Sequence, residues 1–407
     1  MKLMLVCNVS FEHDALTCPA WIKGMISQLA SQHDITLFSY GKSDSDTVTL
    51  NHNAIGWIDA LSYADPDRFS ALMKKEDPAV IVIFGTEKNY SLSAVRLCRH
   101  ANVMDRTALF AQGLACACAD HYAEGVPKRV VSRWTVRDIV RRTNLSKEIK
   151  NMYQAAADEK EAITAAQHFI GRSTLDKAVL RAYNPTAVYY HCNDMLRGCF
   201  YEGEWQYSAC EPHRIFVSQY YYPLKGFHYL LRAADLFKDK YPDLKIVASG
   251  YNPIMGSPIK NELKDSSYIR YIKSLIREFG LADHVEFTGV LTEEQMKEEY
   301  LKANVFVLPS TIENSPNSLA EAMTLGVPCI ASDVGGVSDF AEHRKEAFLY
   351  PSSSTHLLAY YLDAVFSDRE LASQLGQNAR KRAQIDYDRA ANTAALEQAF
   401  QTIAKKS

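Results

Sequence analysis

Two glutamates, Glu313 and Glu321, lie eight positions apart in the segment ENSPNSLAEAM at residues 313–323. On one continuous helix they would share a face, about 12 Å apart. Pro316 argues against that arrangement, because proline fixes its own φ and disfavours helix in the residue before it. We therefore predict a helix that begins near Pro316 or Asn317, with Glu313 on the preceding loop and Glu321 on the helix.

The start of this predicted helix is suited to binding an anion such as a phosphate. The first N–H groups of a helix have no partner within it, and the helix dipole places partial positive charge there. Here those groups belong to Asn317 and Ser318. Glu321, one turn further on, could accept hydrogen bonds from the hydroxyls of a ribose. The simplest alternative is a capped helix whose glutamate faces solvent.

The elements that must position these residues alternate between apolar runs of strand length and helical patterns. Apolar runs occur at residues 2–7, 35–40, 79–85, 107–113 and 168–173, and after Pro212 at 214–219, 244–250, 284–289, 305–310 and 328–333. Such runs are typical of parallel strands that helices bury on both faces. The two series predict an α/β fold with two doubly wound, Rossmann-like domains that face a cleft.

The predicted boundary between the two domains is the aromatic, irregular stretch at residues 193–212. We place an N-terminal domain at residues 1–195, a linker at 196–212 and a C-terminal domain at 213–385. Residues 386–407 form a predicted helix that packs back on the N-terminal domain. Ligands of open α/β sheets bind beyond the carboxyl ends of the strands, so the residues after each strand are the candidates for chemistry.

The composition is that of an ordinary globular protein. The chain has 407 residues, 47% of them hydrophobic and 23% charged, with a net charge of -3. This length allows two domains with separate cores, and the slightly acidic balance argues against nucleic-acid binding. The nine cysteines are scattered without metal-ligand spacing, which predicts reduced thiols and a cytoplasmic location. We expect neither a signal peptide nor a transmembrane helix.

Residues 305–336, VFVLPSTIENSPNSLAEAMTLGVPCIASDVGG, carry several motifs in order: a Pro-Ser strand end, E-x7-E, EAM, G-x-P and D-x-G-G. Together they resemble the nucleotide-sugar-binding segment of the GT-B retaining glycosyltransferases of family 4. The resemblance implies that Glu313 contacts the donor sugar near its reacting carbon and that Glu321 holds the nucleotide ribose. It also implies that the backbone amides of Asn317 and Ser318 receive the diphosphate, with no cofactor besides the nucleotide-sugar substrate.

A second segment, IFVSQYYYPLKGFHYLLRA at residues 215–233, is similar to the first strand and loop of the same family's C-terminal domain. Lys225 stands where the family places a lysine that binds the diphosphate and neutralises its charge. Gln219 replaces the customary arginine, and a glutamine can donate a hydrogen bond but carries no charge. Arg172 and Arg197 are candidate replacements for this charge, and we predict that Arg172 supplies it.

The N-terminal half resembles the acceptor domain of the family more loosely. Its first loop, usually glycine-rich, reads LTCPAWIKG, and its turn begins at Thr17. Gln112 fills the position where family members often have a histidine that hydrogen-bonds the donor sugar. A glutamine can bind a sugar hydroxyl, but it cannot act as an acid or base.

The resemblance implies a retaining route in which the leaving phosphate takes the proton of the acceptor, so no protein base is required. An inverting enzyme would need a base near the acceptor hydroxyl. The carboxylates available after N-terminal strands are Glu87, Glu12 and Asp14. Each could instead be an ordinary loop carboxylate.

A basic segment at residues 128–150, KRVVSRWTVRDIVRRTNLSKEIK, contains eight Lys or Arg against two acids. Its apolar and basic residues lie on opposite sides at helical spacing: Val136, Ile139 and Val140 against Arg137 and Arg141. This pattern fits peripheral contact with the inner face of a membrane, or a lipid-linked acceptor that bears phosphate. The alternative is a helix docked on its own sheet with a solvated basic face.

The predicted function is that of a retaining glycosyltransferase of the hexosyltransferase type. It would move a sugar from a UDP- or GDP-sugar to a saccharide or lipid-linked acceptor during polysaccharide or cell-surface glycan biosynthesis. Gln219 and Gln112 leave open a non-catalytic subunit that binds nucleotide sugars, and a sugar-nucleotide epimerase on the same scaffold is a further alternative. The D-x-D triplet at residues 44–46 lies in a polar loop and reads as a surface turn, so no metal is predicted.

Overall fold

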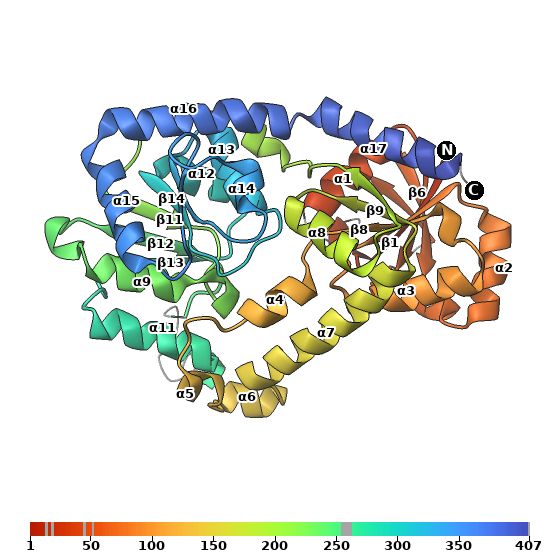
Figure 1. The fold of residues 1–407 in the computed structure, drawn as a ribbon, viewed down its shortest axis with the longest axis horizontal. Helices are drawn as coiled ribbons and strands as arrows, with labels where there is room; N and C mark the ends of the chain where they lie inside the picture. Colours follow the sequence, from red (N-terminus) through yellow and green to blue (C-terminus); the bar gives the residue numbers. More distant parts are fainter. Residues whose placement is uncertain (13–14, 18–19, 44–45, 51–52, 254–262, 406–407) are drawn as a thin grey trace. The chain divides into compact units, whose positions relative to one another are not determined.

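The computed structural model describes residues 1–407 except 13–14, 18–19, 44–45, 51–52, 254–262 and 406–407 (Figure 1). The chain divides into two compact units. The N-terminal unit comprises Met1–Cys116, Gln154–Arg197 and Tyr387–Ser407, and the C-terminal unit comprises Ala117–Tyr153 and Gly198–Asp386. The predicted cleft would require a particular placement of one unit relative to the other, and it stays a prediction.

The N-terminal unit is built on a sheet with the strand order β10-β9-β8-β7-β1-β4-β6-β5, parallel except for the antiparallel pair β5 and β6. Its strands are β1 (Lys2–Cys7), β4 (Asp34–Ser39), β5 (Thr47–Leu50), β6 (Asn53–Asp59), β7 (Val80–Phe84), β8 (Thr107–Phe110), β9 (His168–Gly171) and β10 (Val188–His191). A short hairpin of β2 (Ser10–Glu12) and β3 (Ala15–Thr17) follows β1.

Helices cover both faces of this sheet: α1 (Ala20–Ala30), α2 (Pro66–Glu76), α3 (Asn89–His100), most of α7 (Leu145–Ala165), α8 (Thr174–Tyr183) and α17 (Arg389–Ala404). Successive residues of β1 point to opposite faces. Leu3 and Leu5 pack in one core cluster with α1 and α17, whereas Met4 and Val6 pack in another with α2, α3 and α7. Strand β1 is therefore buried on both sides, as its unbroken apolar sequence predicts.

The C-terminal unit contains a wholly parallel sheet with the order β13-β12-β11-β14-β15-β16. Its strands are β11 (Arg214–Val217), β12 (Lys245–Ser249), β13 (Val285–Gly289), β14 (Val305–Leu308), β15 (Cys329–Ser332) and β16 (Phe348–Tyr350). The strand order reverses between β11 and β14. In doubly wound sheets, ligands bind at this switch point.

The helices of the C-terminal unit surround this sheet (Figure 1). They are α9 (Phe227–Asp235), α11 (Ser267–Glu278), α12 (Glu293–Lys302), α13 (Asn317–Leu325), α14 (Val337–Phe340), α15 (Thr355–Ser367) and α16 (Arg369–Asp386). Short 3-10 turns occur in both units: η1 (Ala60–Tyr63), η2 (Met104–Arg106), η3 (Gly198–Tyr201), η4 (Pro223–Lys225) and η5 (Lys238–Lys240). Both units are thus parallel-sheet α/β domains, as predicted.

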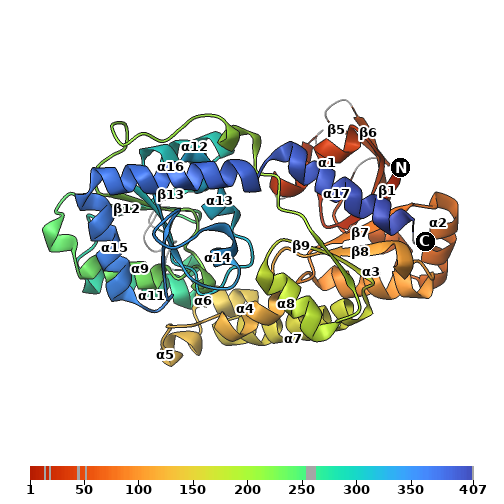
Figure 2. The ribbon, with the colours of Figure 1, turned by 45° about the horizontal axis from the view of Figure 1, so that its top comes forward.

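The division into units differs from the predicted domain boundaries in the assignment of one internal segment. Residues 117–153, which the prediction placed in the N-terminal domain, belong to the C-terminal unit and carry the end of α4 (Ala115–His121), α5 (Lys128–Val131) and α6 (Val136–Arg141). Val130 and Leu145 join the core cluster of that unit, and the ring of His228 on α9 hydrogen-bonds the Glu124 carbonyl at 3.0 Å. Figures 1 and 2 both show α5 beside α11.

The predicted linker and the C-terminal end of the described chain each pack against one of the two units. Trp205, inside the predicted linker, donates from its ring to the Ala303 carbonyl at 2.7 Å, and the chain from Gly198 onward belongs to the C-terminal unit. The last helix, α17, lies in the N-terminal unit, where Leu396, Phe400 and Ile403 share a core cluster with β1. This placement agrees with the predicted return of the chain.

Candidate active site

Two of the predicted site residues, Lys225 and Glu313, contact each other at the switch point of the C-terminal sheet. Lys225 ends η4 after β11, and Glu313 lies on the loop after β14. The Lys225 Nζ atom is 2.6 Å from Glu313 Oε1, and the Ser310 hydroxyl donates to the same oxygen at 2.7 Å. The backbone of this loop is held as well, because the Gly336 amide donates to the Glu313 carbonyl at 3.0 Å.

Gly226 explains why these two loops can approach so closely. Its φ is +62°, in the left-handed region, and a Cβ atom at this position would lie 1.8 Å from the Pro309 carbonyl oxygen. Only glycine lets the backbone pass at this distance. The loops are then joined directly, since the Thr311 amide donates to the Leu224 carbonyl at 2.8 Å. The Lys-Gly pair thus places Lys225 beside Glu313.

The environment of Lys225 favours its charged form. Burial alone would lower the pKa of Lys225, but the charge and hydrogen bond of Glu313, together with the neighbouring Tyr222, raise this pKa above its ordinary value. The ammonium also lies 5.7 Å from the centre of the Tyr222 ring, within range of a cation–π contact. Lys225 is therefore a permanent cation at the end of β11.

The helix α13 begins at Asn317, and Pro316 is its extended N-cap residue with φ -77° and ψ 101°. This confirms the predicted separation of Glu313 on a loop from Glu321 on a helix. Within the described residues, no side chain caps this N-terminus. The buried Oγ of Ser315 and Oδ1 of Asn317 also have no hydrogen-bond partner in the part of the chain that the structure describes. Donors and acceptors at this helix end are thus available to a ligand.

Glu321 lies one turn into α13 and is buried, with 6% of the residue exposed. The Tyr300 hydroxyl donates to the Ser318 carbonyl at 3.0 Å and lies 3.5 Å from Glu321 Oε2. The alternative of a capped helix with a solvent-facing glutamate is therefore wrong on both points. Glu321 is a carboxylate held near the start of the helix.

Gln219, which occupies the customary arginine position, is exposed after β11, and its Oε1 accepts a hydrogen bond from the Tyr222 hydroxyl at 3.2 Å. Arg172, the predicted replacement, is 2% exposed in the N-terminal unit. Its guanidinium is ion-paired with Asp194 and donates to the Ala111 carbonyl at 2.7 Å. This burial argues against the prediction, because the charge of Arg172 is already balanced inside its own unit.

The acceptor-side candidates lie in the N-terminal unit, where Gln112 and Glu87 follow the neighbouring strands β8 and β7. The backbone carbonyl of Gln112 accepts a hydrogen bond from the Arg172 guanidinium at 3.2 Å. Glu87 Oε1 lies 2.8 Å from Lys88 Nζ, while its buried Oε2 finds no partner among the described residues. Thr17 ends β3, but its side chain, like those of Glu12 and Asp14, lies outside what the structure describes.

One carboxylate near these residues was not predicted. Glu159 of α7 is buried, accepts from the Thr86 hydroxyl at 2.7 Å and from the Cys116 amide at 2.9 Å, and its pKa is raised by burial. It thereby links the loop after β7 to the start of α4. The sequence gives no signal for this role, because Glu159 lies in the charged run DEKE of a long helix.

Neither a metal cluster nor a membrane span is found in the described part of the chain. Its residues include no group of three or more His, Cys, Asp or Glu side chains arranged to hold a metal ion. Two residues of the D-x-D triplet, 44 and 45, lie outside that part. No helix among the described residues is both long enough and apolar enough to traverse a bilayer.

The comparisons with known proteins centre on the unit that holds Lys225, Glu313 and Glu321. The family described as glycosyl transferases group 1 matches residues 209–382. The D-inositol 3-phosphate glycosyltransferase of Streptomyces avermitilis is 28% identical over 174 residues, which is 42% of this chain and 36% of that protein. The putative colanic acid biosynthesis glycosyltransferase WcaL of Salmonella typhimurium is 30% identical over 142 residues, 33% and 35% of the two chains. The match therefore spans little more than a third of each relative.

Solved structures resemble the whole chain. Sucrose-phosphate synthase from Thermosynechococcus elongatus has a TM-score of 0.72 at 17% identity and covers 100% of both chains. HepE from Anabaena has a TM-score of 0.65 at 14% identity and covers 99% of both. Identities this low establish the fold alone. The chain therefore has the GT-B fold, and its C-terminal unit is similar in sequence to glycosyl transferases group 1.

Proposed function

We propose that this protein is a retaining glycosyltransferase of the hexosyltransferase type. It moves a sugar from a UDP- or GDP-sugar to a saccharide or lipid-linked acceptor in polysaccharide or cell-surface glycan biosynthesis. The observation that carries the proposal is the Lys225–Glu313 ion pair at the switch point, beside a helix N-terminus without a side-chain cap. Support comes from the family match over the same residues and from HepE, whose solved structures contain UDP and UDP-glucose.

Each part of the donor has a matching group in this arrangement. The ribose hydroxyls donate to the buried carboxylate of Glu321, and the diphosphate accepts from the first amides of α13, at Asn317 and Ser318. Lys225 is close enough to the same loop to pair with the diphosphate. When it does, the diphosphate replaces Glu313 as its partner, and the Glu313 carboxylate becomes available to the hydroxyls of the donor sugar.

The transfer step needs no protein base. The bond between the anomeric carbon and the diphosphate oxygen breaks, and the acceptor oxygen forms a bond to the same face of that carbon. The acceptor proton passes to the departing phosphate oxygen, so atoms and charge balance. Lys225 and the helix amides stabilise the negative charge that grows on the diphosphate, which is the main contribution that the chain makes. Glu87 lies on the other unit and is not required by this route.

A thermal-shift panel of UDP-, GDP- and ADP-sugars tests the proposal, because a ligand that binds the folded state raises its apparent stability. We expect one nucleotide class to raise the unfolding temperature of the wild type. The shift should be lost in Glu321→Ala and retained in Glu298→Ala, which changes an exposed glutamate on α12. No shift with any nucleotide sugar would contradict the proposal.

A non-catalytic subunit that binds nucleotide sugars is the second candidate. Gln219 and Gln112 favour it, since both stand where the family has a charged or titratable side chain, and Arg172 is engaged elsewhere. Slow hydrolysis of the bound nucleotide sugar by the purified protein would support the enzyme. Tight binding without hydrolysis or transfer would support the subunit, and interconversion of two free nucleotide sugars would support an epimerase.

A further inference from the structure

The short helix α6 buries its one acidic residue, Asp138, and exposes its apolar side chains. Asp138 is 1% exposed, whereas Ile139 and Val140 are 64% and 77% exposed. Trp134, just before the helix, is 50% exposed, and Val136 is exposed as well. Four large apolar side chains thus face outward within seven residues. The predicted alternative, in which the apolar side of this helix docks on its own sheet, is wrong for α6.

This exposure belongs to a well-anchored piece of structure. Thr135 and Asp138 form a reciprocal capping box, with hydrogen bonds of 3.2 and 3.0 Å between each side chain and the other residue's amide. The Ser146 hydroxyl donates to the Val131 carbonyl at 3.1 Å, and Leu145 is buried in the core of the C-terminal unit. The buried polar residues therefore hold α6 so that its apolar residues point away from the protein.

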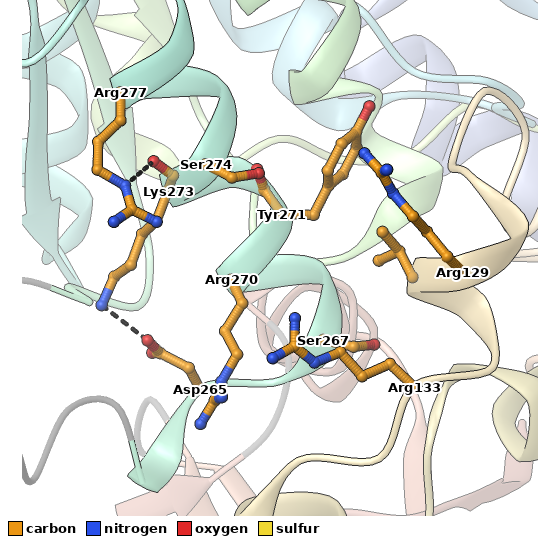
Figure 3. Close-up of a pocket in the computed structure, with 10 residues that line it drawn as sticks. Arg129, Arg133, Asp265, Ser267, Arg270, Tyr271, Lys273, Ser274 and Arg277 are labelled. Atoms are coloured by element: carbon orange, nitrogen blue, oxygen red, sulfur yellow. Dashed lines mark hydrogen bonds and ion pairs between the residues drawn. The ribbon is translucent and has the colours of Figure 1, made fainter.

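A basic pocket is lined by residues of α5, of α11 and of the loop between α5 and α6 (Figure 3). It has a volume of about 480 Å³, and Figure 3 shows Arg129 beside the Tyr271 ring and Arg133 directed toward Arg270 of α11. Asp265, which also lines it, is paired with Lys273 at 2.7 Å, so its charge is balanced. The buried Ser267 hydroxyl at the pocket has no hydrogen-bond partner among the described residues. A pocket of arginines with a free hydroxyl suits a phosphate group.

Arg133 lines the pocket, and the next residue along the chain is Trp134 of the exposed apolar patch. We propose that together they form a surface that binds an anionic lipid bilayer. Trp134, Ile139 and Val140 enter the interface, and the pocket takes the phosphate of one lipid headgroup. Each part complements one layer of such a membrane: apolar side chains meet the acyl boundary, and arginines meet the anionic headgroups. The surface is separate from Lys225 and Glu313, so its test does not depend on transferase activity.

Vesicle flotation of the full chain tests the proposal directly. We expect binding to vesicles of phosphatidylcholine with 30% phosphatidylglycerol, weak binding to phosphatidylcholine alone, and loss of binding as salt rises. The double variant Ile139→Glu/Val140→Glu should lower the bound fraction about tenfold, because it removes the apolar contact and adds charge. Val290→Glu is the matched control, since Val290 is 89% exposed elsewhere on the same unit and its replacement should leave binding unchanged.

The pocket has its own test. Arg133→Ala and Arg270→Ala should each weaken binding to the anionic vesicles about fivefold, whereas Arg96→Ala, an exposed arginine of the N-terminal unit, should have no effect. Binding of inorganic phosphate and of glucose 1-phosphate is measured in parallel, to test whether the pocket takes a free phosphate. Saturation of the pocket by either at micromolar concentration, without binding to vesicles, would assign the site to a free phosphate and overturn the proposal.

Tryptophan fluorescence reports where the protein meets the membrane. Trp134 is 50% exposed, whereas Trp57 and Trp205 are buried. We expect a blue shift on addition of anionic vesicles that vanishes in Trp134→Phe, a variant that retains part of the binding, and this loss assigns the shift to Trp134 among the four tryptophans of the chain. Binding with an unchanged spectrum, or equal binding by the Ile139→Glu/Val140→Glu and Val290→Glu variants, would overturn the proposal. Self-association that the double variant abolishes, without vesicle binding, would assign the patch to a second copy of the chain.

Discussion

Lys225 and Glu313 form a largely buried ion pair at a place where the fold does not need one. Their loops are already held by the Thr311–Leu224 hydrogen bond and by the close approach of Gly226 to Pro309. Buried ion pairs seldom add net stability, because the cost of removing both charges from water offsets their attraction. The proposed function accounts for the pair: Lys225 and Glu313 neutralise each other until the diphosphate of the donor binds.

Replacing the lysine should therefore affect turnover far more than folding. We expect Lys225→Ala to lower the rate of sugar transfer or of donor hydrolysis about 10²- to 10³-fold, because the diphosphate loses a preorganised cation. Steady-state kinetics with circular dichroism checks this expectation. Lys345→Ala, which removes an exposed lysine of the same unit, should retain the wild-type rate. Equal rates in the two variants would show that Lys225 is not part of the site.

Glu321 should govern affinity rather than rate. Its buried carboxylate can accept two hydrogen bonds from a ribose, and such charged hydrogen bonds contribute about 1.5–3 kcal/mol each. We expect Glu321→Gln to raise the Kd of the nucleoside diphosphate at least about tenfold in calorimetry, and to raise that of the matching 2′,3′-dideoxy nucleotide little. A similar loss with both nucleotides would exclude contact between Glu321 and the ribose.

The loop between β11 and α9 illustrates how one small residue sets the geometry of a site. Gly226→Ala forces a methyl group against the Pro309 carbonyl and should cost several kcal/mol, well above the 1–2 kcal/mol of left-handed strain alone. Gly280→Ala is a matched control, because Gly280 has a φ of +63° but nothing within 4 Å of the added carbon. Urea unfolding of both variants measures the loss of stability in each, and the difference between the two losses is the steric contribution at Gly226. Similar losses of stability would mean that the close approach is unimportant.

The attachment of residues 117–153 to α9 should depend on pH. Burial, aided by nearby Arg232, lowers the pKa of His228 to about 3 from its ordinary 6.5, and the neutral ring bonds the Glu124 carbonyl and the Tyr268 hydroxyl. Between about pH 6.5 and pH 3 the unfolded chain therefore binds up to one proton more than the folded chain. The stability that neutral His228 contributes is fully present above pH 6.5 and declines as pH falls toward 3.

We expect the free energy of unfolding to fall by about 1 kcal/mol per pH unit between pH 6 and 5 on account of His228. His228→Gln can still donate to the Glu124 carbonyl but does not titrate, so its stability curve should be flatter over this interval. Denaturant unfolding of both proteins at several pH values measures the difference. Parallel curves would show that His228 does not determine the acid sensitivity.

The first strand, β1, and the last helix, α17, pack in one core although they lie far apart along the chain. Phe400 is buried in the same cluster as Leu3 and Leu5. Phe400→Ala should destabilise the N-terminal unit by about 3–5 kcal/mol, whereas the exposed Gln401→Ala should have little effect. Hydrogen exchange should accelerate in β1 and β4 but not in β11 and β14. Faster exchange in all four strands would mean that the two units unfold as one.

Much of this architecture follows from local sequence. Unbroken apolar strands such as β1 and β14 predict parallel sheets, since only burial on both faces accounts for them. Pro316 fixes the start of α13, and the Lys-Gly pair marks a loop with a left-handed residue. These features depend on a few neighbouring residues, so the positions of Lys225, Glu313 and Glu321 on their elements could be read before the fold was known.

Other features depend on contacts between distant segments. Arg172 is a buried structural arginine because Asp194 and the Ala111 carbonyl meet it across two strands, which its own neighbourhood in the sequence does not reveal. The apolar residues of α6 are exposed because Asp138 and Thr135 are turned inward, although the amphipathic pattern is the same for either orientation. The sequence by itself thus determined the elements and the chemistry at their ends. Only the tertiary structure decided which charges are already paired and which faces stay open, because both depend on groups far apart along the chain.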